Sequence, residues 1–143
     1  MNILISGCLL GLKCRYDGKE KKLPEIEKLI KEYNLIPICP EQLGGLVTPR
    51  TPAEIINAKV ITQDNKDVTD KYKLGAEEAL KLAKLFDCKK AILKENSPSC
   101  GCGKIYDGTF SHKLIDGNGI TADLFLKNNI EVIGESQIKK LLK

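Results

Sequence analysis

Residues 2–8 read NILISGC, and this segment decides the fold class. Asn2–Ser6 is a short, largely apolar run that ends at a glycine, which is typical of a parallel strand buried on both faces. Comparable short apolar runs follow at Leu35–Ile38, Ala91–Leu93 and Glu131–Ile133. We therefore predict a mainly parallel sheet whose strands are spread along the whole chain.

Segments with helical periodicity alternate with these strands. Asp70–Phe86 is the clearest helix, because apolar residues recur along one side of it. Helices are also predicted at Leu23–Tyr33, Thr121–Asn128 and Ser136–Leu142. This alternation is the signature of an α/β domain with right-handed crossovers.

The remaining segments add little regular structure to this prediction. Lys59–Thr69 alternates around an Asp-Asn turn signal, which predicts a small β-hairpin inserted in the domain. Pro40–Pro52 and residues 94–120 lack periodicity and are predicted to be loops. A chain of 143 residues suffices for one domain with a real core, so residues 1–143 are predicted to form a single domain.

Composition argues against two classes of function. The net charge of +4 is spread over scattered lysines, and the chain has no Trp and three Phe, so no nucleic-acid surface is indicated. No apolar run approaches the roughly 20 residues of a membrane span. The segment before Cys8 lacks a basic leader and is too short for a signal core, so we expect a cytoplasmic protein.

Cysteines follow three of the predicted strands. Cys8 comes after the first strand, Cys39 after the second, and Cys100 lies in the loop after the third. Parallel strands deliver their carboxyl ends to one edge of the sheet, where ligands bind, so these three thiols are expected to meet. In a reducing compartment, they point to metal or sulfur chemistry, with small buried hydrophobes as the alternative.

The number of thiols limits the kind of metal. A structural zinc site normally has four ligands, and the lone histidine, His112, sits well down a loop. A [4Fe–4S] cluster on three cysteines leaves one iron open, which is an arrangement suited to chemistry. A zinc-stabilised binding module stays open as a rival prediction.

Five blocks of sequence resemble the thiouracil desulfurase family, in the same order and over nearly the whole chain. They are ISGCLLGLKCRYDGK (5–19), CPEQLGGLVTPRTPAEI (39–55), KENSPSCG (94–101), IYDGTFS (105–111) and GNGITADLF (117–125). The resemblance implies a Rossmann-like three-layer sandwich that carries a [4Fe-4S] cluster with three cysteine ligands and one open iron. By motif, the ligands are Cys8, Cys39 and Cys100.

The resemblance also implies an activity: the open iron binds the sulfur of a thiolated pyrimidine such as 2-thiouracil, and sulfur is removed without net electron transfer. Glu41, two residues after Cys39, is the expected base that delivers water to the ring carbon. Ser97 or Ser99 is expected to orient substrate or relay a proton. An ordinary loop carboxylate and turn-forming serines are the alternative interpretations.

Arg15, Asp17 and Arg50 are polar groups expected near this site. The arginines are candidates for offsetting the cluster's charge or binding a base carbonyl, or else for holding loops together through ion pairs. Cys14 and Cys102 are not expected to be ligands.

An alternative function is a hydrosulfide carrier, which holds sulfide on the open iron for a sulfur-acceptor protein. The expected partners are thus a small thiolated base or hydrosulfide, with nucleic acid only as thiolated RNA and no membrane.

Overall fold

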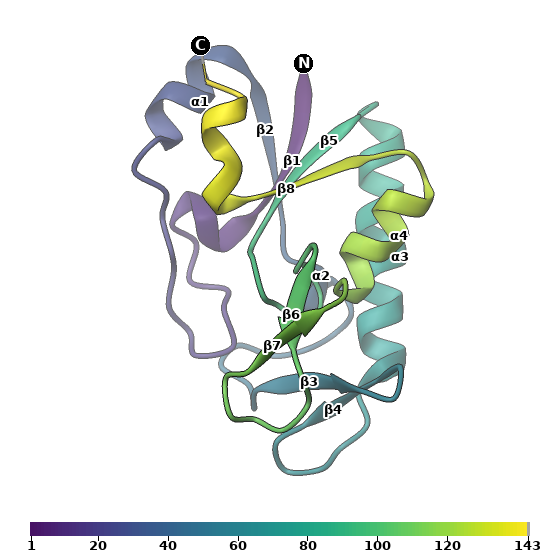
Figure 1. The fold of residues 1–143 in the computed structure, drawn as a ribbon. Coiled ribbons are helices and arrows are strands. Elements are labelled where there is room, and N and C mark those ends of the chain that lie inside the picture. The colour runs from purple at the N-terminus through teal and green to yellow at the C-terminus, as the bar shows by residue number, and fades with distance from the viewer. Residues whose placement is uncertain (143) are drawn as a thin grey trace.

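The computed structural model describes residues 1–142, and its core is a four-stranded parallel sheet (Figure 1). The strands are β1 (Asn2–Ser6), β2 (Asn34–Ile38), β5 (Lys90–Leu93) and β8 (Glu131–Gly134), in the order β2-β1-β5-β8. All four lie where the sequence predicted strands. Pro37 has no N–H to donate, and it is accommodated because β2 is an edge strand.

Helices cover both faces of the sheet, as the three-layer prediction requires. On one face, α1 (Ile26–Glu32) and the 3₁₀ helices η1 (Gly7–Leu10) and η2 (Glu135–Lys140) pack on the sheet; α3 (Thr69–Leu85) and α4 (Ile120–Lys127) cover the other (Figure 1). Alternate residues of a strand point to opposite faces, so neighbouring residues of β1 belong to different cores. The α/β prediction is confirmed, although α1 is shorter than predicted and η2 is a 3₁₀ helix.

A short helix, α2 (Pro40–Leu43), occupies part of the predicted loop 40–52. It spans a single turn, too short to show periodicity, and Pro40 takes the first helical position, where its missing N–H costs nothing. Its end packs directly on α3. A Cβ built on Gly44 would lie 2.9 Å from the carbonyl carbon of Lys71, and one on Gly75 would lie 2.7 Å from that of Pro40. The two backbones therefore touch.

Two antiparallel hairpins correct the sequence prediction. β4 (Lys59–Thr62) pairs along its whole length with β3 (Ala53–Ile56), which the sequence did not predict as a strand. The predicted pairing within 59–69 is present only in part, as one isolated antiparallel bridge between Ile61 and Asp67, flanked by backbone hydrogen bonds from Thr62 N to Lys66 O and from Val68 N to Val60 O. The turn between β3 and β4 has positive φ at Asn57 and Ala58. Alanine is not typical of this conformation, so its presence in the sequence does not indicate such a turn.

A second hairpin, formed by β6 (Lys104–Tyr106) and β7 (Leu114–Asp116), lies within the predicted loop 94–120. Its strands have three residues each, too few for alternation to stand out. Within residues 1–142, no helix has both the length and the apolar character needed to cross a membrane.

Candidate active site

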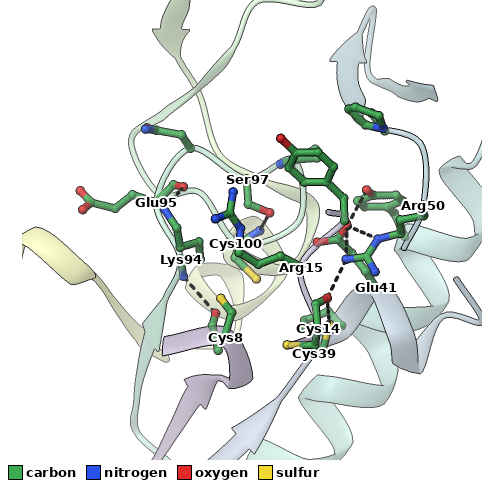
Figure 2. A pocket seen from close by; sticks show the side chains of 18 of the residues that line it. Cys8, Cys14, Arg15, Cys39, Glu41, Arg50, Lys94, Glu95, Ser97 and Cys100 are labelled. Carbon is green, nitrogen blue, oxygen red and sulfur yellow. Dashed lines mark hydrogen bonds and ion pairs between the residues drawn. The ribbon is translucent and has the colours of Figure 1, made fainter. Parts of the chain in front are cut away.

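A pocket of ≈ 190 Å³ opens at the carboxyl edge of the sheet (Figure 2). From β1 the chain crosses to β2 on one side, while β5 borders β1 on the other side. Connections diverge at such a point and leave a crevice between them. The loops after these three strands supply much of the pocket wall.

The structure brings Cys8, Cys39 and Cys100 together in this pocket. Cys8 lies in η1 directly after β1, Cys39 separates β2 from α2, and Cys100 lies in the loop that follows β5. Figure 2 shows their sulfur atoms directed from three sides toward a common space. Residues remote in sequence thus form one sulfur-lined site, and their role as ligands stays a prediction.

The chemical type of these ligand atoms points to a soft metal centre. A tetrahedral zinc holds its thiolates at about 2.3 Å, so all ligands crowd around one point. Within the described residues, no three His, Cys, Asp or Glu side chains converge in that way. Soft thiolates arranged around a space are the donors that iron–sulfur clusters use. Three cysteine thiols around one pocket are therefore a donor set that fits an iron–sulfur cluster.

The pKa values of Cys100 and Cys39 are both raised. Burial is the main cause for Cys100. It raises the pKa of Cys100 to about 12, and the negative charge of Glu41 adds to the effect. The pKa of Cys39 is raised further, first by a hydrogen bond with Cys14 and then by burial. In the absence of a metal, Cys39 and Cys100 are therefore neutral at pH 7, and metal binding must expel their protons.

Glu41 faces the pocket from the first turn of α2 and is held through only one of its oxygens. Oε2 accepts hydrogen bonds from Arg50 Nε at 3.1 Å and from the Tyr72 hydroxyl at 2.9 Å. Arg50 Nη2 also lies 3.1 Å from Oε2. Because these donors all converge on Oε2, Oε1 is left for water or substrate (Figure 2).

Arg50 directs its donors into the protein. Nη1 donates to Val47 O at 3.2 Å and to Thr48 Oγ1 at 3.0 Å, and Nη2 donates to Cys14 O at 3.1 Å. Only 6% of the side chain is exposed. Arg50 therefore ties the loop after α2 and the loop that contains Cys14 to Glu41, and this geometry favours the loop-holding interpretation over contact with a base.

Arg15 lines the pocket more openly, whereas Asp17 does not belong to its wall. Arg15 Nη2 lies 3.7 Å from Asp17 Oδ2, and the guanidinium sits over the ring of Tyr16, 5.7 Å from its centroid. Asp17 also accepts the N–H of Lys19. Asp17 therefore affects the site only indirectly, through its ion pair with Arg15.

The structure separates the two candidate serines. Ser97 lines the pocket, and its Oγ accepts the N–H groups of Ser99 and Cys100 at 3.0 and 3.1 Å. Ser99 is 1% exposed and does not line the pocket; its Oγ lies 2.8 Å from Thr121 Oγ1. Ser97 is therefore the serine that a bound molecule can reach.

Sequence reasoning missed several residues of the pocket wall, above all Tyr72 and Tyr106. Tyr72 belongs to the apolar stripe of α3, where nothing marks it as different from a core residue. Burial and then the charge of Glu41 raise the pKa of its phenol, which therefore stays protonated as a donor. Tyr106 meets His112 edge to face, with ring centroids 5.7 Å apart, and His112, although exposed, also lines the pocket.

Glu54 anchors the loop between Tyr106 and His112. Glu54 of β3 is 7% exposed, and its Oε1 accepts the N–H groups of Gly108 at 2.9 Å and Phe110 at 3.1 Å. A buried carboxylate must find such donors to offset its lost hydration. The first hairpin therefore fixes the part of the pocket wall that the second hairpin supplies.

Comparison with known proteins agrees with this architecture. A family model described as 2-thiouracil desulfurase matches residues 3–137. The chain is 45% identical over 150 residues to the uncharacterized protein YbbK of Bacillus subtilis (strain 168), covering 98% of this chain and 99% of YbbK. A solved structure of the [4Fe-4S]-dependent thiouracil desulfidase TudS superposes with a TM-score of 0.93 at 42% identity, over 98% of this chain and 94% of that one. This chain belongs to the 2-thiouracil desulfurase family.

Proposed function

We propose that residues 1–143 form one thiouracil desulfurase-like domain, which binds a [4Fe-4S] cluster and removes sulfur from 2-thiouracil-like pyrimidines. One observation carries the proposal: three thiols from three strand ends surround a pocket that a carboxylate also enters. The relationship to TudS, whose cluster dependence its name states, supports the choice of cofactor.

Cys8, Cys39 and Cys100 are the proposed ligands. A cluster held by three thiolates has one iron free of protein ligands, and that soft Lewis acid would bind a thiocarbonyl sulfur. Arg15, which lines the pocket beside these thiols, is the cation best placed to offset the negative charge of the site.

Glu41 is the proposed base. Its Oε1 accepts a proton from the water that attacks the ring carbon, and the carbon–sulfur bond then breaks. The overall reaction takes one water and one thiouracil to uracil and hydrogen sulfide, so no electrons are gained or lost. Ser97, at the pocket wall, orients the substrate, while Ser99 supports the backbone behind Cys100.

A hydrosulfide carrier is the second candidate, because the pocket holds a thiol that three-cysteine ligation does not need. Cys14 lines the same pocket, and its carbonyl oxygen accepts a hydrogen bond from Cys39 Sγ at 3.6 Å. A carrier would keep sulfide in the site for a sulfur-acceptor protein in place of releasing it.

Anaerobically purified protein tests both candidates. We expect broad visible absorption from bound iron and sulfide, and release of sulfide and uracil from 2-thiouracil in equal amounts. Both signals should vanish in the triple variant Cys8→Ala, Cys39→Ala, Cys100→Ala.

Cys88→Ala is the matched control, since Cys88 is a buried cysteine just before β5, at the opposite edge of the sheet. A colourless protein with bound zinc would contradict the cluster. An iron-loaded protein that binds sulfide but produces no uracil would favour the carrier.

A further inference from the structure

We propose that Tyr72 and Arg50 are positioning residues for Glu41: together they hold Oε2 and so turn Oε1 toward the pocket. This inference rests on the proposed function, in which Glu41 is the base. It assigns a role in the reaction to a tyrosine of α3 that sequence patterns place in the core.

The first argument is that the donors to the Glu41 carboxylate converge on one of its two oxygens. Tyr72 OH and Arg50 Nε donate to the same oxygen, Oε2, at 2.9 and 3.1 Å. Arg50 Nη2 lies 3.1 Å from that oxygen as well. Donors that approach one oxygen from two different segments limit rotation of the carboxylate, because a turn in either direction lengthens at least one contact.

The second argument is the burial of the tyrosine. Tyr72 is 3% exposed, so its hydroxyl has little access to water and Glu41 is the partner that satisfies it. The contact between α2 and α3 brings the two side chains together, and it depends on Gly44 and Gly75, where any Cβ would clash with the facing backbone. The fold thus provides this contact at a point where larger residues cannot fit.

The third argument is the rigidity of the arginine. Arg50 is fixed in turn by the carbonyl oxygens of Val47 and Cys14 and by the hydroxyl of Thr48. The same carbonyl oxygen of Cys14 also accepts a hydrogen bond from Cys39 Sγ at 3.6 Å. The base and one of the proposed sulfur ligands are therefore held in one frame, with Arg50 and the Cys14 carbonyl connecting them.

The consequence is a loss of rate with little loss of substrate binding. Without the Tyr72 hydroxyl, Glu41 keeps its charge and its arginine partner but gains freedom to rotate. Misplacing a reacting group by about 1 Å can cost on the order of 100-fold in rate. We therefore expect Tyr72→Phe to lower kcat by about tenfold or more while KM changes less than about twofold.

The experiment uses anaerobic, cluster-loaded protein with 2-thiouracil as substrate and sulfide release as the signal. Tyr33→Phe is the matched control: its hydroxyl donates one hydrogen bond, to Leu141 O at 2.8 Å, outside the pocket. The control should keep the wild-type kcat. Both variants should bind the wild-type amount of iron, which separates a positioning role from loss of the site.

A double substitution tests whether Tyr72 acts through Glu41. Glu41→Gln alone should lower kcat about 100-fold or more, and adding Tyr72→Phe should then cost less than about twofold further. Arg50→Lys, which keeps the charge but loses the planar fork, should lower kcat as Tyr72→Phe does. It serves as the second test if Tyr72→Phe does not fold.

The outcomes distinguish the two levels of the proposal. If Glu41→Gln is slow but Tyr72→Phe is as fast as Tyr33→Phe, the positioning role is wrong and the proposed base survives. If the losses in kcat caused by Tyr72→Phe and by Glu41→Gln multiply in the double variant, Tyr72 acts independently of Glu41 and the inference is also wrong. If Glu41→Gln is fully active, the proposed base and the positioning role fail together.

Discussion

The close contact between α2 and α3 predicts an unusual response to a small substitution, Gly75→Ala. The new Cβ would lie 2.7 Å from the carbonyl carbon of Pro40, whereas ordinary contacts are 3.4–4 Å. The carbonyl oxygen of Pro40 would lie closer still, so the helices must separate by more than about 0.7 Å, the difference between 3.4 and 2.7 Å that the carbonyl carbon alone requires. Because the facing atoms are backbone, no rotamer change can relieve the overlap.

The magnitude follows from two opposing contributions. Overpacking of a fixed site costs about 3 kcal/mol at the upper end of its usual range. Replacing glycine by alanine inside a helix returns about 1 kcal/mol. The free energy of unfolding should therefore fall by about 2 kcal/mol. At about 2.1 cal/mol/K per residue, the unfolding entropy of a chain of this length translates this into a Tm lower by about 7 °C.

The assay is thermal unfolding followed by circular dichroism under anaerobic conditions, with sulfide release measured alongside. Glu77→Ala is the control in the same helix: Glu77 is exposed, and its replacement should change stability by less than about 0.5 kcal/mol. Gly75→Ala should also lower the rate, since Glu41 moves with α2. A Tm for Gly75→Ala equal to or above that of wild type would refute the backbone contact.

Three further predictions concern the pocket wall and its thiols. Glu54→Ala should destabilise the protein by about 2 kcal/mol, because the N–H groups of Gly108 and Phe110 lose their acceptor. Hydrogen exchange at these two amides should accelerate, and an unchanged exchange rate would contradict the anchoring role. Ser97→Ala should slow sulfide release more than Ser99→Ala does, whereas Ser99→Ala should lower the free energy of unfolding by about 1 kcal/mol. If Ser99→Ala were the slower variant, the functional hydroxyl would lie outside the pocket. In protein prepared without iron, the free energy of unfolding should fall as the pH rises from the usual thiol pKa of 9.0 toward about 12, because the unfolded Cys100 ionises while the folded one stays neutral. Cys100→Ala should reduce that slope in urea titrations, and an unchanged slope would show that Cys100 titrates normally in the fold.

The extent of sequence-based prediction differs between the sheet and its insertions. Asn2–Ser6 was predicted with its observed bounds, and the other three strands were located to within a residue or so at each end. Buried parallel strands are continuously apolar, so they are visible locally. Of the hairpin strands, only β4 lies in a segment that was predicted to form a hairpin. The strands β3, β6 and β7 are three or four residues long, and the turn at Asn57–Ala58 carries no glycine, so local sequence offered no comparable signal for them.

The candidate site divides in the same way. Cys8, Cys39 and Cys100 could be brought together from sequence, because a general rule sends the ends of parallel strands to one edge. The hydrogen-bond partners of Glu41 could not be predicted from the sequence. Tyr72 is separated from Glu41 by 31 residues and reads as part of an apolar stripe.

By itself, the sequence determined the four strands of the parallel sheet and the edge at which three thiols gather, because these follow from local hydrophobicity and chain topology. Only the tertiary structure decided which oxygen of Glu41 is held, which serine reaches the pocket and where two helices touch. Those features depend on atoms that meet across long stretches of chain, and neither composition nor periodicity records such encounters.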